Sequence, residues 1–248
     1  MRQYHVALER GEIGRYVILP GNPGRVEKLA KFLDNPYFVR QNREYCTWNG
    51  TLDGELVSIV STGIGGPSAA ICLEELIEIG ADTFIRTGTC GGLQPEIKRS
   101  HIIIPTGSVR GGATANAYVP PQFPSLANYE IVNHLAATAR ELGSPYHTGI
   151  VQCKDAFYLE DPDKLPNGIK ARQDWEMWVK AGVLASEMES DTLFVIGSIR
   201  KVRVGTVLIS LGGRAEEGPM IGTTPEDLEH MMGCALGAIR RCIRENKK

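Results

Sequence analysis

The chain has 248 residues, which suits one large domain or two small ones and is enough to bury a full hydrophobic core without cross-links. Lys and Arg total 27 against 29 Asp and Glu, a formal net charge of −2 that argues against a generally basic nucleic-acid-binding protein. The 42% hydrophobic and 23% charged fractions are those of a globular chain and exclude a disordered one.

Short apolar strands alternate with amphipathic helices along the chain. A strand over 16–19 ends at Pro-Gly, and the following helix has Val26, Leu29 and Leu33 among its apolar positions. Further strands are predicted at 56–61, 83–86, 101–104, 149–153 and 202–210. Further helices are predicted around Ile71 to Ile79 and at about 126–142, 189–200 and 225–245, the last with Thr224 as N-cap. This alternation predicts an α/β fold with a parallel or mixed sheet between helices, and no linker divides residues 1–248, so we expect a single domain.

Three glycine-rich segments follow predicted strands, at 20–25, 62–68 and 86–92, and we interpret the last as a turn that ends its strand. Ligands of open α/β sheets bind at this carboxyl edge, where backbone N–H groups and arginines such as Arg25 and Arg86 suit a phosphate. Neither standard nucleotide-phosphate motif is present, and each segment alone is more simply a structural turn. The coincidence of three such segments therefore carries the phosphate hypothesis.

Two carboxylates, Glu187 and Glu189, follow the apolar run at 182–185. At the mouth of a buried strand they would be costly unless they bound something with hydroxyl donors. The alternative is an exposed helix start, where acidic residues favour the helix dipole.

Together these segments resemble the nucleoside phosphorylase family, most closely its uridine phosphorylase branch. The matching segments cover nearly the whole chain, at 20–25, 42–45, 61–68, 86–91, 108–110 and 187–190. The stretch 195–202 is also similar to some protozoan purine nucleoside phosphorylases. The resemblance implies a three-layer α/β/α fold with a central mixed sheet. It also implies reversible phosphorolysis of a nucleoside to a free base and ribose 1-phosphate, with inorganic phosphate as co-substrate and no cofactor.

The resemblance implies a role for individual residues. Phosphate is held by Gly21, Arg25, Arg86 and Thr89, together with Arg43 from a neighbouring subunit. The ribose is held by Glu187, Met188, Glu189 and, from the neighbour, His5. The base contacts Phe157, Gly91 and Arg214, and the residues expected to act in catalysis are Arg86, Glu189 and Arg214.

The physical chemistry of the reaction fits these roles. Glycosidic cleavage passes through an oxocarbenium-like sugar, so a phosphate dianion against C1′ both stabilises positive charge and acts as the nucleophile. Glu189 accepting a hydrogen bond from the 2′-hydroxyl binds this cationic state more strongly than the ground state.

The base-binding segment departs from the family pattern. Uridine phosphorylases carry a Gln-x-Arg pair shortly after the residues that match Phe157, whereas residues 159–163 here read Leu-Glu-Asp-Pro-Asp. A carboxylate cannot donate to a uracil carbonyl, so the substitutes considered are Gln152, Lys154 and Arg172-Gln173. The acid with which purine phosphorylases protonate the base is also missing before Glu216. Uridine is therefore the favoured substrate, and a purine nucleoside such as inosine or guanosine is the alternative.

Oligomerisation follows from the resemblance alone, since family members form dimers with shared sites that usually assemble into hexamers. Some relatives hold a monovalent cation such as potassium between subunits through a glutamate that matches Glu44, for which an ordinary salt bridge is the alternative. A nucleosidase and a non-catalytic nucleoside-binding protein are the other classes considered.

The cysteines and the N-terminus indicate a compartment. Six cysteines show no C-x-x-C pair and no zinc-type spacing, so we interpret them as reduced thiols, mostly in the core. Residues 1–5 lack the apolar segment of a signal peptide, and no window reaches the roughly 18 apolar residues that span a membrane. We therefore expect a cytoplasmic protein without a membrane partner.

Overall fold

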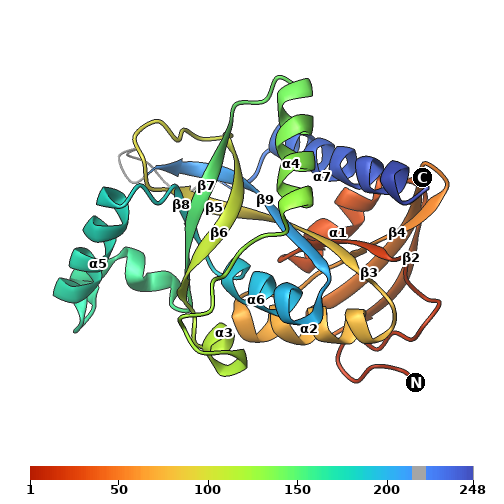
Figure 1. Ribbon diagram of the computed structural model, residues 1–248, viewed down its shortest axis with the longest axis horizontal. Helices are drawn as coiled ribbons and strands as arrows, with labels where there is room; N and C mark the ends of the chain where they lie inside the picture. The colour runs from red at the N-terminus through yellow and green to blue at the C-terminus, as the bar shows by residue number, and fades with distance from the viewer. Residues whose placement is uncertain (214–221, 248) are drawn as a thin grey trace.

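The computed structural model describes residues 1–213 and 222–247 and contains one mixed sheet with helices on both faces (Figure 1). Arg214, expected at the base, lies outside these residues. The strands are β1 (Tyr16–Pro20), β2 (Asp34–Asn42), β3 (Tyr45–Leu52), β4 (Glu55–Val60), β5 (Thr83–Gly92), β6 (Ile102–Gly111), β7 (Tyr146–Lys154), β8 (Ala185–Glu187) and β9 (Arg203–Gly213). The α-helices are α1 (Pro23–Ala30), α2 (Gly66–Glu78), α3 (Ala113–Tyr118), α4 (Tyr129–Glu141), α5 (Gly168–Lys180), α6 (Ser190–Arg200) and α7 (Pro225–Asn246), with 3₁₀ turns η1 (Phe157–Glu160) and η2 (Pro162–Lys164).

The three layers follow from the two-residue period of the strands. In β1, Tyr16 and Ile18 pack into a core shared with α1, α4 and α7, whereas Val17 and Leu19 pack into a second core with α2 and α6. Figure 1 shows α4 and α7 above the sheet and α2 and α6 below it. The predicted α/β/α fold with a central mixed sheet is confirmed.

Half of the sheet closes on itself. The strand order is β2-β3-β4-β1-β5-β8-β7-β6-β9, and β9 also pairs with β5, so five strands form a ring. A third core cluster fills that ring, formed by Cys90, Ile97, Ile103, Val151, Ala185 and Leu208. The carboxyl ends of β5, β7 and β8 are thereby held around one opening.

The predicted turn at 86–92 is wrong. β5 continues through these residues to Gly92, because Thr87 to Cys90 pair with β9 and the last two glycines pair with β8. The small residues serve packing rather than a change of direction. A Cβ at Gly88 would lie 2.7 Å from Nη2 of Arg86, so this glycine leaves room for the guanidinium.

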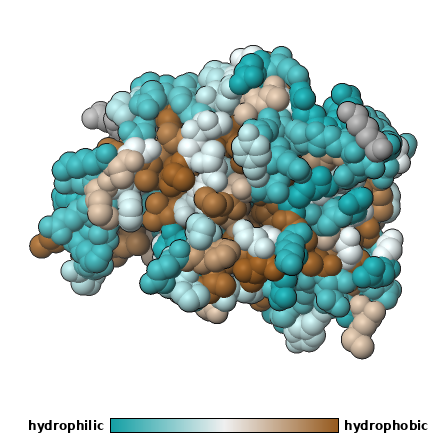
Figure 2. All heavy atoms as spheres, in the orientation of Figure 1, coloured by the Kyte–Doolittle hydropathy of each residue, from teal (hydrophilic) through white to brown (hydrophobic). Residues whose placement is uncertain are grey.

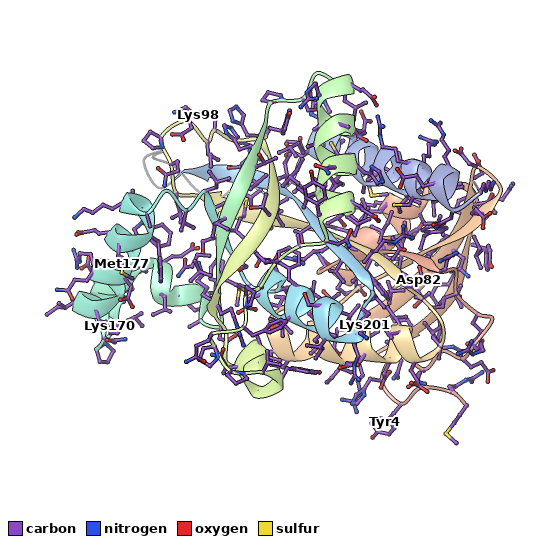
Figure 3. All side chains as sticks on the ribbon, in the orientation of Figure 1. Tyr4, Asp82, Lys98, Lys170, Met177 and Lys201 are labelled. Carbon is purple, nitrogen blue, oxygen red and sulfur yellow. The ribbon has the colours of Figure 1, made fainter. Side chains whose placement is uncertain are left out.

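Several elements were not predicted. The hairpin of β2 and β3 extends the sheet at one edge, and the first strand is exposed along most of its length. Helix α5 projects from the body of the molecule (Figure 1), and Lys170 and Met177 point outward from it (Figure 3). The strands and helices that the sequence does predict are found. Their ends differ from the predicted ones by a few residues, except that β6, like β5, extends further at its carboxyl end.

The surface has the hydropathy expected of a globular chain. Hydrophilic residues cover most of the face in Figure 2, and apolar groups come to the surface near its centre. No helix within the described ranges has the length and apolar character needed to cross a membrane.

All six cysteines are buried thiols, as predicted, and burial raises the pKa of Cys234 to about 12.

The start of α7 confirms the predicted N-cap. Thr224 Oγ1 accepts the Asp227 N–H at 3.1 Å, and the Asp227 carboxylate accepts the Thr224 N–H at 2.8 Å, which makes a capping box. Burial alone would raise the pKa of Asp227, but hydrogen bonds from Ser100 and Thr224 outweigh it and lower the pKa.

We expect Thr224→Ala to lower the free energy of unfolding by about 1 kcal/mol, because the helix loses its cap. Urea denaturation at one protein concentration measures the change, and Thr223→Ala, beside the cap, is the matched control. Because folding lowers the pKa of Asp227, the stabilisation from its carboxylate is complete above about pH 4 and is lost as the pH falls through the folded value. Equal denaturation midpoints for Thr224→Ala and the control would contradict the role of the cap.

Candidate active site

A cleft of about 1180 Å³ opens at the carboxyl ends of β1, β5, β7 and β8. β1 and β5 run parallel, and their carboxyl ends form the edge at which open α/β sheets bind ligands. Most of the residues predicted from the sequence line it, namely Gly21, Glu44, Arg25, Arg86, Thr89, Gly91, Phe157, Glu187, Met188 and Glu189. Segments far apart in the chain therefore meet in one site, with predicted residues that run from Gly21 to Glu189.

Two of the glycine-rich segments meet at one side of the cleft. A Cβ at Gly21 would lie 3.2 Å from the carbonyl oxygen of Gly63, so the first segment passes close to the second only because it has no side chain there. Asn22 caps α1 by accepting the Gly24 N–H at 2.8 Å. The cap sets Arg25 in the first turn of the helix, with its side chain at the cleft.

The centre of the cleft is a buried ion cluster. Arg86 on β5 donates from Nε to Glu187 at 3.1 Å and from Nη2 to Glu189. All three residues are 4% exposed. Buried charges of this kind are stable only when they are paired and hydrogen-bonded, which is the case here.

The two carboxylates have different tasks. Glu187 accepts the backbone N–H groups of Glu189 and Ser190, so it caps α6 in addition to pairing with Arg86. The alternative of a helix start is thus correct, but the exposure that it assumed is wrong. Glu189 accepts the Gly65 N–H at 2.7 Å, which ties it to the second glycine-rich segment. Burial, and after it the charge of Glu187, raises the pKa of Glu189 against the opposing effect of Arg86.

One side of Arg86 has unused hydrogen-bonding capacity. Its Nη1 is buried, and it has no hydrogen-bond partner in the part of the chain that the structure describes. This nitrogen faces the first glycine-rich segment, 3.8 Å from the position of a Cβ at Gly21. Arg25 lines the same cleft, where burial, and after it the charge of Arg86, lowers the pKa of Arg25. This arrangement favours an anion between the two guanidinium groups.

A second group of cleft residues surrounds the aromatic side chain predicted to face the base. Phe157 and Gly91 line the cleft, and so do Lys154, Glu160, Trp175 and Ser186, of which Lys154 contacts Phe157, Glu160, Trp175 and Ser186. Of the three substitutes considered for the missing Gln-x-Arg pair, only Lys154 lies in the cleft; Arg172 is exposed and pairs with Asp163. Trp175 is not among the predicted site residues, because the helix that carries it, α5, is not predicted from the sequence.

Two predicted residues, His5 and Arg43, do not line the cleft of this chain. His5 pairs through Nδ1 with Glu75 on α2 at 2.7 Å. Arg43 stands in the two-residue turn between β2 and β3 with φ +53°, and its guanidinium lies over the ring of Tyr4. Their expected places in a neighbouring subunit's site stay a prediction.

Glu44 lies in the cleft lining and accepts a hydrogen bond from Ser68 Oγ at 2.8 Å. A hydrogen bond with its own backbone, and then the Ser68 bond and the charge of Arg43, lower its pKa against the effect of burial. The described residues hold no group of three or more side chains suited to a metal ion, and a cation at Glu44 stays a prediction.

Comparison with known proteins gives this site a family. Residues 15–244 match the phosphorylase superfamily. The chain is 42% identical over 246 residues to a uridine phosphorylase of Treponema pallidum, covering 98% of this chain and 95% of the relative. It is 40% identical to a uridine phosphorylase of Thermococcus kodakarensis, over 86% of this chain and 78% of that one. A guanosine phosphorylase of Halorubrum lacusprofundi is 34% identical over 91% and 89% of the two chains.

The match spans the whole sheet and every described segment that lines the cleft, and the relative from Treponema pallidum is similar over 95% of its length. The chain belongs to the phosphorylase superfamily.

Proposed function

We propose that the protein catalyses reversible phosphorolysis of a nucleoside, with uridine as the preferred substrate, to give uracil and ribose 1-phosphate. The observation that carries this proposal is the buried Nη1 of Arg86, which has no hydrogen-bond partner among the described residues. It faces the glycine-rich segment at Gly21, Arg25 lines the same cleft, and Nη2 of Arg86 pairs with Glu189. An anion site thus adjoins a carboxylate suited to sugar hydroxyls. The similarity to two uridine phosphorylases supports the choice of uridine.

The reaction needs no nucleophile from the protein. A phosphate oxygen bonds to C1′ as the bond from C1′ to the base nitrogen breaks, and the electron pair leaves with the base. The proton carried by hydrogenphosphate balances the charge on the released base. Arg25 and Arg86 hold the phosphate in line with C1′, which supplies both orientation and charge stabilisation.

Glu189 suits the sugar because its carboxylate retains acceptor capacity. Its two oxygens accept from Gly65 and Arg86, and a carboxylate has about four lone-pair sites, so ribose hydroxyl groups can still donate to it. A hydrogen bond from the 2′-hydroxyl strengthens as the ring becomes cationic, which is selective stabilisation of the transition state.

The balance of charge supports a shared site. Glu187 and Glu189 already offset the charge of Arg86, so a phosphate dianion needs positive charge from elsewhere. Arg25 supplies one charge, and Arg43 of the partner subunit supplies a second. The exposed apolar side chains of Tyr37 and Phe38 lie on edge strand β2, the strand that leads into the turn carrying Arg43, and they favour a covering subunit.

Guanosine is the second candidate substrate. The relative from Halorubrum lacusprofundi favours it, and so does Glu160 in the cleft, since a carboxylate accepts from the N–H groups of guanine.

The proposal is tested by phosphorolysis of uridine, thymidine, inosine, guanosine and adenosine, measured side by side with and without phosphate. We expect phosphate-dependent cleavage with the highest kcat/KM for uridine. Activity confined to purine nucleosides would replace uridine by the second candidate, and base release without phosphate would indicate a nucleosidase instead.

Arg25→Met is expected to lower kcat/KM for phosphate by about 10- to 150-fold, because one charge-assisted contact is worth about 1.5 to 3 kcal/mol. Initial rates at varied phosphate and saturating nucleoside measure this loss. Lys28→Met, an exposed cation one turn further along α1, is the matched control and should leave the value unchanged. An unchanged phosphate dependence in Arg25→Met would remove Arg25 from the phosphate site.

Subunit sharing predicts complementation between defective subunits. Arg43→Ala and Glu189→Ala should each lose most activity, and a mixed dimer would regain one intact site out of two. Random mixing should therefore restore about a quarter of wild-type activity, measured on differently tagged, co-expressed chains.

The control for this experiment mixes Arg25→Met with Glu189→Ala, whose defects fall in the same subunit's site and cannot complement each other. A recovery in the control, or none in the mixture of Arg43→Ala with Glu189→Ala, would contradict the shared site.

A further inference from the structure

The part of the cleft around Phe157 contains a buried cation that the phosphate and sugar chemistry does not use. Lys154, the last residue of β7, is 4% exposed. Its Nζ donates to Ser186 Oγ at 2.9 Å and to the carboxylate of Glu160. The ring centres of Phe157 and Trp175 each lie 5.9 Å from this nitrogen.

Burial of this ammonium is costly for the fold alone. Removing a charge from water costs several kcal/mol, and a buried ion pair is seldom more stabilising than apolar side chains of the same size. Lys154 nevertheless lies at the cleft wall. An ammonium group has three N–H donors, and its contacts within the described residues occupy two of them. The third is available to a ligand in the cleft.

Glu160 provides the complementary group. It ends η1, and its Oε1 lies 4.0 Å from the position of a Cβ at Gly91, so the carboxylate stands across from the glycine at the end of β5. A carboxylate only accepts hydrogen bonds, whereas an ammonium only donates them. The donor and the acceptor are therefore adjacent in a compartment whose walls include Phe157 and Trp175.

We propose that Lys154 and Glu160 recognise the base, with Lys154 donating to a carbonyl oxygen and Glu160 accepting from the ring N–H beside that carbonyl. This inference rests on the proposed function and specifies its substrate class as nucleosides of oxo bases. Uracil presents a carbonyl next to an N–H, and so does a 6-oxopurine. The pair takes the place of the missing Gln-x-Arg motif.

The same geometry excludes other bases. Cytosine presents an unprotonated ring nitrogen where uracil has N3–H, and this lone pair would face the carboxylate of Glu160. A site that hydrogen-bonds specific polar groups rejects analogues strongly, because its buried groups are then unpaired. Lys154 has a further effect, since negative charge spreads onto the carbonyls as the base leaves and a buried cation stabilises that charge.

The role of Glu160 is tested by the ratio of kcat/KM for uridine to that for 3-methyluridine, which lacks the N3–H. The ratio is taken within one enzyme preparation, so it does not depend on the fraction that is folded. We expect Glu160→Ala to lower this ratio by about tenfold or more, and Glu160→Gln, whose amide oxygen still accepts, to lower it less. Asp163→Ala, an exposed carboxylate of the same segment, should keep the wild-type ratio.

The role of Lys154 is tested in the same way with 2-thiouridine and 4-thiouridine, in each of which sulfur, a weaker acceptor, replaces one carbonyl oxygen. The wild type should prefer uridine to both analogues. In Lys154→Met one of the two preferences should fall by about tenfold or more, and the analogue affected identifies the carbonyl that Lys154 contacts.

Variants too slow to assay are compared by equilibrium binding of uracil and 3-methyluracil in the presence of phosphate, followed by tryptophan fluorescence. Unchanged ratios in Glu160→Ala and in Lys154→Met, with uridine still cleaved by the wild type, would overturn this inference alone. A wild-type protein that cleaves no nucleoside would instead refute the proposed function.

Discussion

One buried guanidinium organises the site. Arg86 reaches from β5 to the two carboxylates that surround the start of α6, and it thereby connects the central strand to the element that carries Glu187 and Glu189. Glu187 in turn accepts the first N–H groups of α6, and Glu189 accepts from the glycine-rich segment before α2. Removing the central charge would leave two buried carboxylates without compensation, which is far costlier than the loss of one contact.

The closed half of the sheet explains why this cluster and the base compartment lie side by side. Strand β5 continues past Arg86 to Gly91 and Gly92, where β8 pairs with it just before Glu187. Strand β7 pairs with the other edge of β8, which places Lys154 next to Ser186. The proposed sugar-binding and base-binding groups therefore share the three-residue strand β8, and a shift of that strand would disturb both.

The prediction from sequence succeeded where periodicity was strong and failed where packing decided. Strands such as β1 and the long amphipathic α7 were predicted because their apolar positions follow the period of one buried face. The exposed strand β2, with Pro36 and a mostly polar sequence, has no such pattern. Residues 87–92 read as a turn because they are small, but two neighbouring strands pair with them.

The candidate site divides in the same way. Arg25, Arg86 and Glu189 are predicted as site residues because they stand in recognisable segments, and the structure brings them together in one cleft, where their anion and sugar roles stay a proposal. The sequence does not single out the residues that contact the base, because the members of this compartment come from β7, η1, α5 and β8 and only the folded sheet joins them.

The turn at Arg43 has a consequence for engineering. A non-glycine residue at φ +53° costs on the order of 1 kcal/mol, so selection for heat resistance alone would discard this arginine in favour of glycine and, under the proposed sharing, yield sturdier but slower enzymes.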